Sequence, residues 1–189
     1  MTNLWMIWIF LIIIATFHLS EFFLVWCFHR DNLSWESMLF SWPYVAMLLL
    51  AIGEFWIESH YLFVLKQSLV SAFGIGLCIF GELIRKSAMV TAGRGFTHEI
   101  AEHHHPGHQL TTHGIYRFSR HPGYFGWFWW AIGAQLVLSN PLSTIVAVIA
   151  AWRFFAERIP YEEERLQHFF GKTYSAYRLS TPTRLPFIP

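Results

Sequence analysis

Long apolar runs, each interrupted by only a few charged residues, constrain the fold of this chain more than any other feature. A helix needs about 20 mostly apolar residues to cross a bilayer, and five runs reach or approach that length. They are Leu4–Phe28, Pro43–Tyr61, Leu69–Val90, Tyr124–Leu138 and Leu142–Phe155. The sequence therefore predicts an all-α integral membrane protein with about five transmembrane helices.

The last two runs are short for full spans, and only Ser139, Asn140 and Pro141 separate them, so we expect a tight helical hairpin. The length of 189 residues predicts a single domain, 1–189, with three spans in 1–97 and the other two in 98–189. Charged residues make up 13% of the chain, against about 25% in an average soluble domain. The net charge of +1 argues against a nucleic-acid-binding protein.

The distribution of lysine and arginine predicts the orientation, because cytoplasmic loops are enriched in both. With five spans, the 86–121 connection and the C-terminal tail share one side of the membrane. That side holds Lys86, Arg94, Arg117, Arg120, Arg158, Arg165, Lys172, Arg178 and Arg184, whereas the 60–68 loop opposite holds Lys66 alone. We therefore expect the 86–121 connection and the tail to face the cytoplasm.

Small residues in the third span indicate a close contact with another helix. Ala72 and Gly76 lie four residues apart, with Gly74 and Gly81 nearby. Small residues at such spacing let two helix backbones approach closely in lipid. We expect this stripe to pack against a neighbouring span.

Charged and polar residues within the spans predict pairing between helices, because an isolated charge in lipid is costly. His18 and Glu21 share one helix face, as do Glu54 and Glu58. Glu82 has Arg85 and Lys86 close to it in the sequence, so these three can neutralise one another locally. Pairing that fixes the bundle is at least as good an explanation as contact with a substrate, and the predicted catalytic set leaves these residues out.

The stretch HQLTTHGIYRFSRHPGYFGW, at residues 108–127, concentrates polar groups directly before the fourth run. Pro122 suits the first turn of a helix, where its missing N–H has no cost. A helix that begins there places its positive dipole end near Arg120 and His121. Such a site can hold an anionic group, and Tyr116 and Tyr124 can flank a flat ring.

A second polar cluster, RFFAERIPYEEER at 153–165, follows the fifth run. Arg158 offers a planar set of donors that suits a carboxylate, and Glu162 can accept hydrogen bonds from sugar hydroxyls. Taken alone, a solvated helix face with i, i+4 pairs is the better explanation of Arg158, Glu162, Glu163 and Glu164. Residues 160–178 resemble an interfacial amphipathic helix interrupted near Gly171. We expect the chain to bring both clusters together at one membrane face.

A run of histidines raises the question of a metal site, since imidazole is a common ligand for zinc and iron. The run comprises His98, His103, His104, His105, His108, His113 and His121. Ligands on a helix need i, i+3 or i, i+4 repeats, and Pro106 with Gly107 interrupts any helix here. We expect a hydrated loop and no metal.

Taken together, the chain resembles the isoprenylcysteine carboxyl methyltransferases, integral membrane enzymes that methylate the C-terminal prenylated cysteine of CaaX proteins. The resemblance covers almost the whole chain. It is carried by ATFHLSEF at 15–22, GELIRKSAMVTAGRGFTH at 81–98, HGIYRFSRHPGYFGWFWWAIGAQLVLSNP at 113–141, WRFFAERIPYEEE at 152–164, HFFGKTYSAYR, and PTRLPFI toward the end. The RHPxYxG core occurs in related bacterial membrane methyltransferases, whereas its combination with GELIRKSAMVTAG and LPFI is typical of the eukaryotic-type enzymes.

The resemblance implies S-adenosylmethionine as cofactor, bound at the cytoplasmic face without a Rossmann domain. The implied cofactor-binding residues are His108, Gln109, Leu110, Thr111, Tyr116, His121, Pro122, Gly123, Tyr124 and Glu162. Arg158 matches the arginine that faces the reacting carboxylate, and Arg120 is the second predicted catalytic residue. A glutamine that contacts the cofactor in the family falls near Ala101 here. Prenylated CaaX proteins, with farnesyl or geranylgeranyl chains, and membrane lipid are the implied partners, and the endoplasmic reticulum the implied location.

Two other functions stay open on the residues alone. Membrane sterol reductases share a related C-terminal fold and an RHxxYxG-like stretch but bind NADPH. They typically carry Asn where Gly123 stands and an acid shortly after Gly126, where this chain has Trp127, which favours methyl transfer. A membrane protein that binds prenyl tails without catalysis is the third reading, and it leaves the polar clusters unexplained.

Overall fold

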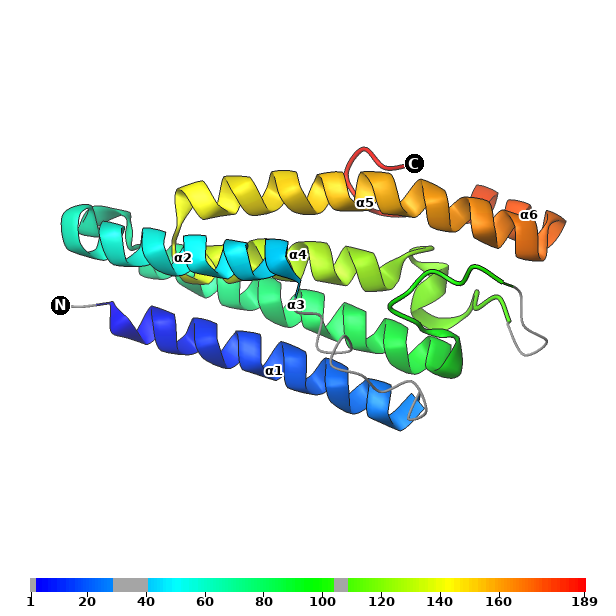
Figure 1. Cartoon of the computed structure of the whole chain (residues 1–189), viewed down its shortest axis with the longest axis horizontal. Helices are drawn as coiled ribbons and strands as arrows, with labels where there is room; N and C mark the ends of the chain where they lie inside the picture. Colours follow the sequence, from blue (N-terminus) through cyan, green and yellow to red (C-terminus); the bar gives the residue numbers. More distant parts are fainter. Residues whose placement is uncertain (1–2, 29–40, 104–108) are drawn as a thin grey trace.

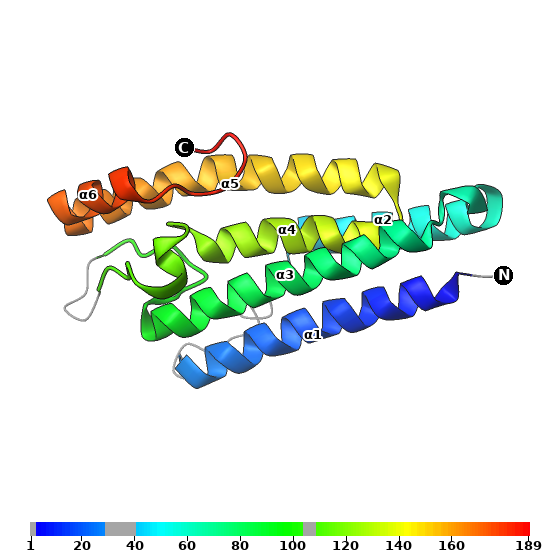
Figure 2. The ribbon, with the colours of Figure 1, turned by 180° about the vertical axis from the view of Figure 1, so that it is seen from behind.

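The computed structural model describes residues 3–28, 41–103 and 109–189, and throughout these ranges the only regular secondary structure is helical. The α-helices are α1 (Leu4–Phe28), α2 (Trp42–Tyr61), α3 (Ser68–Ala92), α4 (Pro122–Val137), α5 (Pro141–Phe170) and α6 (Lys172–Ser180). Three short 3-10 helices, η3 (Phe63–Leu65), η4 (Gly93–Gly95) and η5 (Gly114–Arg117), lie in the connections. The long helices run side by side along the long axis of the molecule (Figures 1 and 2). The predicted all-α fold is confirmed.

The predicted spans coincide with the first four helices to within two residues. The Ser41 hydroxyl accepts a hydrogen bond from the Tyr44 backbone N–H at the start of α2, and a proline occupies the first turn. Pro122 begins α4 as predicted, because a proline in the first turn gives up no helical hydrogen bond. The tight turn between α4 and α5 includes Ser139, whose φ of 52° lies in the left-handed region.

The fifth predicted run, Leu142–Phe155, is the first part of a longer helix. α5 continues without a break to Phe170, with Pro160 inside it. A proline within a helix removes one backbone hydrogen bond and normally kinks or ends the helix. Here side chains on both sides of Pro160, Arg158 and Glu163, bind groups on or next to α4, and these contacts hold the second half of α5 in place. The interruption near Gly171 is confirmed, since Gly171 has a φ of 50° and separates α5 from α6.

Two helical stretches among the described residues, Leu4–Phe28 and Ser68–Gly95, are long and apolar enough to cross a membrane by length and composition. α4 has 16 residues and is short for such a span. α2 carries Glu54 and Glu58, and the second half of α5 is highly charged. The five predicted spans therefore all exist as helices, and two of them, α1 and α3, combine the length and the apolar composition of a membrane span.

Glycines join α3 to α4, but not those of the predicted Ala72–Gly76 stripe. Gly76 has open space around it. A Cβ on Gly81 would lie 2.4 Å from the Gly126 carbonyl oxygen, and a Cβ on Gly74 would lie 2.8 Å from the Gly133 carbonyl oxygen. Two glycines on each helix, one heptad apart, therefore let the backbones touch. The predicted close contact is confirmed at Gly74 and Gly81, whereas Ala72 and Gly76 are exposed on another face of α3.

Buried polar side chains on different helices pair with one another, as predicted. Glu21 of α1 is fully buried and receives hydrogen bonds from Arg85 of α3, with Nε–Oε1 and Nη2–Oε2 distances of 2.7 and 2.8 Å. Lys86 also contacts Glu21, and the His98 ring lies 2.8 Å from it. Arg85 thus pairs with an acidic residue of another helix. Lys86 also forms the predicted local ion pair with Glu82, with an Nζ–Oε1 distance of 3.5 Å.

At the opposite end of the bundle, α2 holds the α4–α5 turn. The Glu54 carboxylate accepts hydrogen bonds from the backbone N–H groups of Leu142 and Ser143, at 2.7 and 2.6 Å, and so caps α5 from a neighbouring helix. Lys66 is buried and donates to Glu58 at 2.7 Å and to Asn140 at 2.6 Å. These contacts satisfy the carboxylates within the apolar bundle and fix the depth of α4 relative to α5.

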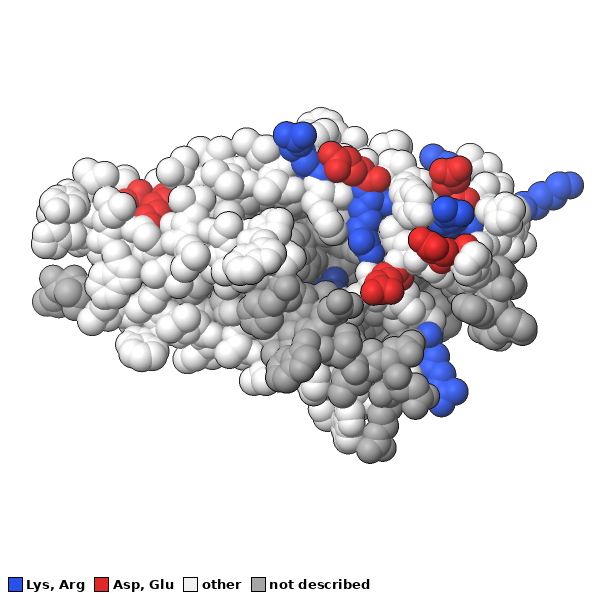
Figure 3. Space-filling model, in the orientation of Figure 1, with Lys and Arg blue, Asp and Glu red and all other residues white. Residues whose placement is uncertain are grey.

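Charged side chains gather over one end of the molecule, where α5 and α6 end. Most of the rest of the visible face is uncharged (Figure 3). This polarity agrees with the predicted arrangement, in which the basic and acidic clusters of residues 86–121 and of the tail share one side.

Candidate active site

The two polar clusters meet where α4 begins and where α5 passes it. The Tyr124 hydroxyl donates a hydrogen bond to Glu162 Oε2 at 2.6 Å and accepts one from Arg158 Nε at 2.8 Å. Arg158 Nη2 also donates to the His98 backbone carbonyl at 2.5 Å. One tyrosine of α4 therefore connects the arginine and the glutamate of α5. The alternative of a purely solvated helix face does not describe Arg158 and Glu162, since both are partly buried in this network.

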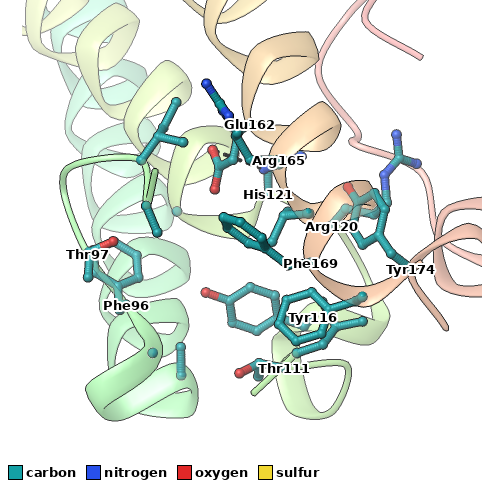
Figure 4. Close-up of a pocket in the computed structure, with 18 of the residues that line it drawn as sticks. Phe96, Thr97, Thr111, Tyr116, Arg120, His121, Glu162, Arg165, Phe169 and Tyr174 are labelled. Carbon is teal, nitrogen blue, oxygen red and sulfur yellow. Dashed lines mark ion pairs between the residues drawn. The ribbon is translucent and has the colours of Figure 1, made fainter. Parts of the chain in front are cut away.

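A cavity lies next to this junction, between the end of α3, the loop before α4, and the second half of α5 with α6. Its walls contain nine of the ten predicted cofactor-binding residues, Gln109, Leu110, Thr111, Tyr116, His121, Pro122, Gly123, Tyr124 and Glu162. The tenth, His108, lies outside the described residues. Ala101 also lines this cavity. Figure 4 shows Phe96 and Thr97 on one side of the cavity and Tyr174 on the other, with Glu162 and Tyr116 between them. We call this space the polar cavity.

The polar cavity also has walls that reasoning from the sequence missed. Leu166, Phe169 and Phe170 from the end of α5, with Tyr174 and Tyr177 from α6, complete its lining. The pattern HFFGKTYSAYR signalled only an interfacial helix, because nothing local shows that α6 folds back. The left-handed φ of Gly171 makes that reversal possible. Burial raises the pKa of Tyr116, and the nearby Glu162 carboxylate adds to the increase, so this phenol stays neutral at physiological pH.

A second, apolar cavity of about 820 Å³ extends from the same junction into the bundle. α1, α2, α4 and α5 supply most of its lining, chiefly alanine and aromatic side chains, and Arg85 of α3 and residues 96–98 complete it. Arg158, His98 and Tyr124 lie at its polar end. Phe96, Thr97 and Tyr124 line both spaces, so the polar and the apolar cavity meet at these three residues. We call the second space the apolar cavity.

Arg120, the second predicted catalytic residue, lies in the wall of the polar cavity with its guanidinium bound to the tail. Its Nε donates to Glu163 Oε1 at 2.8 Å, and the other nitrogens donate to the carbonyls of Arg178, Thr181 and Pro189. It is 6% exposed. With its donors so engaged, Arg120 is placed to hold α6 and the tail against the start of α4.

Glu163, which was not among the predicted site residues, links the residues directly before α4 to α6. His121 Nε2 lies 3.2 Å from its Oε1, and Arg178 Nε lies 3.1 Å from its Oε2. Burial tends to raise the pKa of Glu163, but hydrogen bonds from His121 and Arg120 outweigh it and lower the pKa below 4.5. The carboxylate is therefore ionised at physiological pH.

The lowered pKa of Glu163 predicts how the stability of the fold depends on pH. The ionised Glu163 stabilises the folded state fully above its ordinary pKa of 4.5, and this contribution is lost as pH falls through the lowered pKa. We expect Glu163→Gln to lower the melting temperature of the detergent-solubilised protein at about pH 7, and this difference from the parent to shrink at about pH 3. Thermal melts of both proteins at both pH values check this. An equal difference at the two pH values would contradict the assignment.

Metal ligation has no support in the part of the chain that the structure describes, where no group of three or more potential ligands comes together. His98 is engaged with Glu21. His104, His105 and His108 lie outside the described residues, so the expectation for that loop stays a prediction.

Comparisons with known proteins agree with this arrangement. The family model described as isoprenylcysteine carboxyl methyltransferase matches residues 74–168. A probable protein-S-isoprenylcysteine O-methyltransferase of Oryza sativa subsp. indica is 46% identical over 183 residues, covering 96% of each chain. The Mus musculus protein-S-isoprenylcysteine O-methyltransferase is 40% identical, covering 93% of this chain and 63% of its own. The solved structure of a eukaryotic intramembrane Ras methyltransferase superposes with a TM-score of 0.96 at 37% identity, covering 100% of this chain and 68% of that one.

An all-helical fold shared with a solved intramembrane methyltransferase defines the class of this protein. The chain belongs to the isoprenylcysteine carboxyl methyltransferase family. Its activity is accordingly the methylation of the carboxyl group of an isoprenylated cysteine, as a protein-S-isoprenylcysteine O-methyltransferase. Family membership decides among the three functions that the residues alone left open, in favour of methyl transfer.

Proposed function

We propose that the protein transfers the methyl group of S-adenosylmethionine to the C-terminal carboxylate of farnesylated or geranylgeranylated cysteine in CaaX-processed proteins. The polar cavity takes the cofactor and the apolar cavity takes the lipid chain. The observation that carries this proposal is their meeting at Phe96, Thr97 and Tyr124. A methyl donor on one side and a prenylcysteine on the other have their reactive groups together only at such a junction.

The residues of the polar cavity suit S-adenosylmethionine. Gly123 leaves room for the Phe96 ring, since a Cβ there would lie 3.0 Å from it, and both residues line the polar cavity. Glu162 can accept hydrogen bonds from ribose hydroxyls, and Tyr116, Phe169 and Tyr174 offer aromatic faces to an adenine ring or a cation. When bound, this cofactor supplies an electrophilic methyl group on a positively charged sulfur.

Few protein groups are needed for the chemistry, because the nucleophile is already active. An α-carboxyl group has an ordinary pKa of about 3.5 and is ionised at neutral pH, so no general base is required. What the chain supplies is alignment and exclusion of water. We assign Arg158 to hold the carboxylate with the free donors of its guanidinium, while Tyr124 and the His98 carbonyl fix its position. Arg120 acts as a positioning residue through Glu163.

The apolar cavity suits an isoprenoid chain, because most of its lining beyond Arg158 is apolar. Burying hydrocarbon there gains about 25 cal/mol per Å² of apolar surface removed from water. We propose that the chain enters sideways from the bilayer and that five helices span the membrane. The active site then faces the cytoplasm, and the endoplasmic reticulum is the membrane in which we place the protein.

Methyl transfer to a small substrate tests the proposal. Purified protein reconstituted in vesicles is incubated with methyl-labelled S-adenosylmethionine and either N-acetyl-farnesylcysteine or non-prenylated N-acetylcysteine. Base-labile label on the farnesylated compound alone is the expected result, since a methyl ester is hydrolysed by base. Cofactor binding without transfer to this acceptor would contradict the proposed substrate, and absence of cofactor binding would contradict the proposed donor.

A further inference from the structure

Both groups that hold Arg158 are connected to one buried carboxylate on α1, that of Glu21. Arg158 Nε donates to the Tyr124 hydroxyl at 2.8 Å, and Arg158 Nη2 donates to the His98 backbone carbonyl at 2.5 Å. Glu21 is fully buried and lines neither the polar nor the apolar cavity. The proposed reaction therefore gives Glu21 no contact with substrate or cofactor, and any effect on catalysis has to pass through other side chains.

The first connection runs through the His98 side chain. His98 follows η4 in a segment without regular secondary structure, so the position of its carbonyl depends on side-chain contacts. The ring Nε2 lies 2.8 Å from Glu21 Oε2. Glu21 is paired with Arg85 and Lys86 and is thus an ionised acceptor, so the ring nitrogen is the donor. This hydrogen bond attaches the segment that carries the His98 carbonyl to the helical bundle.

The second connection runs through Arg85 to the start of α4. Arg85 Nε and Nη2 donate to Glu21 at 2.7 and 2.8 Å, and Arg85 Nη1 donates to the Gly123 backbone carbonyl at 3.1 Å. A bidentate pair fixes the plane of a guanidinium group. Gly123 directly precedes Tyr124 in the first turn of α4. The Tyr124 hydroxyl, like the His98 carbonyl, is therefore held from the Glu21 carboxylate.

The segment 96–98 packs on the same ion pair with a second side chain. The guanidinium carbon of Arg85 lies 5.7 Å from the centre of the Phe96 ring, which in turn meets the His98 ring edge to face at 5.7 Å. Phe96 lines both cavities where they meet. Charged groups buried and hydrogen-bonded in this way are strongly coupled, because the local dielectric is low. A change at Glu21 is thus transmitted to the junction of the two cavities.

Resting on the proposed function, we propose that Glu21 is a positioning residue for methyl transfer, which acts through the His98 side chain to fix Arg158 against the substrate carboxylate. A guanidinium group held at both Nε and Nη2 has its plane and its rotation set, so Nη1 points in one direction. Alignment of this kind matters in an in-line displacement, where a misplacement of about 1 Å can cost about 100-fold in rate.

The test compares His98→Leu with His98→Gln in protein reconstituted in vesicles. Leucine cannot donate to Glu21, whereas the glutamine amide reaches about as far as the imidazole Nε2 and donates. We expect His98→Leu to lower kcat by about 30-fold, with KM for N-acetyl-farnesylcysteine and the dissociation constant of S-adenosylmethionine changed by less than about threefold. His98→Gln is expected to keep kcat within about threefold of the parent. Dividing the rate by the number of cofactor-binding sites, counted by calorimetry, removes the effect of unfolded protein.

A double substitution tests whether His98 acts on Arg158. Arg158→Lys removes Nη2, the atom that the His98 carbonyl binds. In the Arg158→Lys background, His98→Leu is therefore expected to lower kcat by less than about threefold, because the two changes affect one contact. A general structural role of His98 would lower kcat by the same factor in both backgrounds.

His103→Leu is the matched control, because His103 is an exposed histidine of the same connection and lines neither cavity. Its kcat is expected to equal that of the parent. Glu21→Gln weakens both connections and is expected to lose at least as much kcat per binding site as His98→Leu. If Glu21→Gln does not fold, the comparison of the two His98 variants decides.

Three results would overturn the proposal: a parent-like kcat in His98→Leu, equal losses in His98→Leu and His98→Gln, or a full 30-fold loss from His98→Leu in the Arg158→Lys background. Failure of the proposed function is recognised separately, in the parent and in Arg158→Ala. A parent that does not methylate N-acetyl-farnesylcysteine contradicts the substrate, and an active Arg158→Ala contradicts the role of Arg158. In either case the inference about Glu21 falls as well.

Discussion

Arg158→Ala is expected to abolish methyl transfer, with a loss in kcat of about 1000-fold, while cofactor binding changes little. The guanidinium lines the apolar cavity at its polar end and is held by Tyr124 and by the His98 carbonyl. It does not line the polar cavity. Removing it leaves the substrate carboxylate without an aligning partner and leaves the proposed cofactor site intact. Turnover with saturating farnesyl substrate, and cofactor affinity by calorimetry, measure the two effects separately.

Two further variants make this prediction specific. Arg153→Ala removes an exposed arginine from the same helix and is expected to retain full activity. Arg158→Lys keeps the charge but loses the planar set of donors, so we expect partial activity between that of the parent and that of Arg158→Ala. Retained activity in Arg158→Ala would overturn the role assigned to this residue. Loss of activity together with loss of cofactor affinity would show instead that Arg158 supports the polar cavity.

Gly81→Ala is expected to destabilise the fold strongly, because Gly81 is buried at the contact between α3 and α4. The new Cβ would lie 2.4 Å from the Gly126 carbonyl oxygen and 2.7 Å from the Trp130 backbone nitrogen. Neither atom belongs to a flexible side chain, so α3 and α4 have to separate. We expect a loss of about 3 kcal/mol or more in stability. With the exposed Cys27 replaced by serine in both proteins, the temperature at which the buried Cys78 becomes reactive toward a thiol-specific fluorophore measures it.

Gly76→Ala is the matched control for this variant. Gly76 lies on the same helix, and a Cβ there meets nothing within 4 Å. Alanine has the higher helix propensity, so this change is expected to stabilise α3 slightly, by about 0.5–1 kcal/mol. If both substitutions shift the melting temperature equally, close contact between the backbones of α3 and α4 is not what makes Gly81 necessary.

Local sequence predicted those parts of the fold that depend on a single segment. A long apolar run forms a helix wherever it is placed, because its backbone has to satisfy its own hydrogen bonds in an apolar environment. α1 to α4 therefore have nearly their predicted bounds, and Pro122 begins α4. α5 continues past the fifth apolar run to Phe170, and the contacts of Arg158 and Glu163, which no local pattern shows, hold the helix through Pro160.

The residues of the candidate site were likewise predicted only in part from local sequence. The resemblance of 108–127 and 152–164 to a known family supplied the predicted cofactor-binding residues, and nine of them line one cavity. Nothing in either segment indicated that Glu163 joins Arg120 to Arg178, or that Phe169 and Tyr174 close the cavity. These contacts connect residues far apart in the chain, so they exist only after α5 has packed beside α4.

The amino-acid sequence by itself determined that the chain is a bundle of apolar helices with two polar clusters beside one another at one end. Hydrophobic runs and helix-starting prolines act within a few residues and need no partner. The tertiary structure alone decided which faces meet: Gly81 on Gly126, Glu21 on Arg85, and Tyr124 between Arg158 and Glu162. Those pairings depend on the depth and rotation of each helix, which packing and buried hydrogen bonds set together.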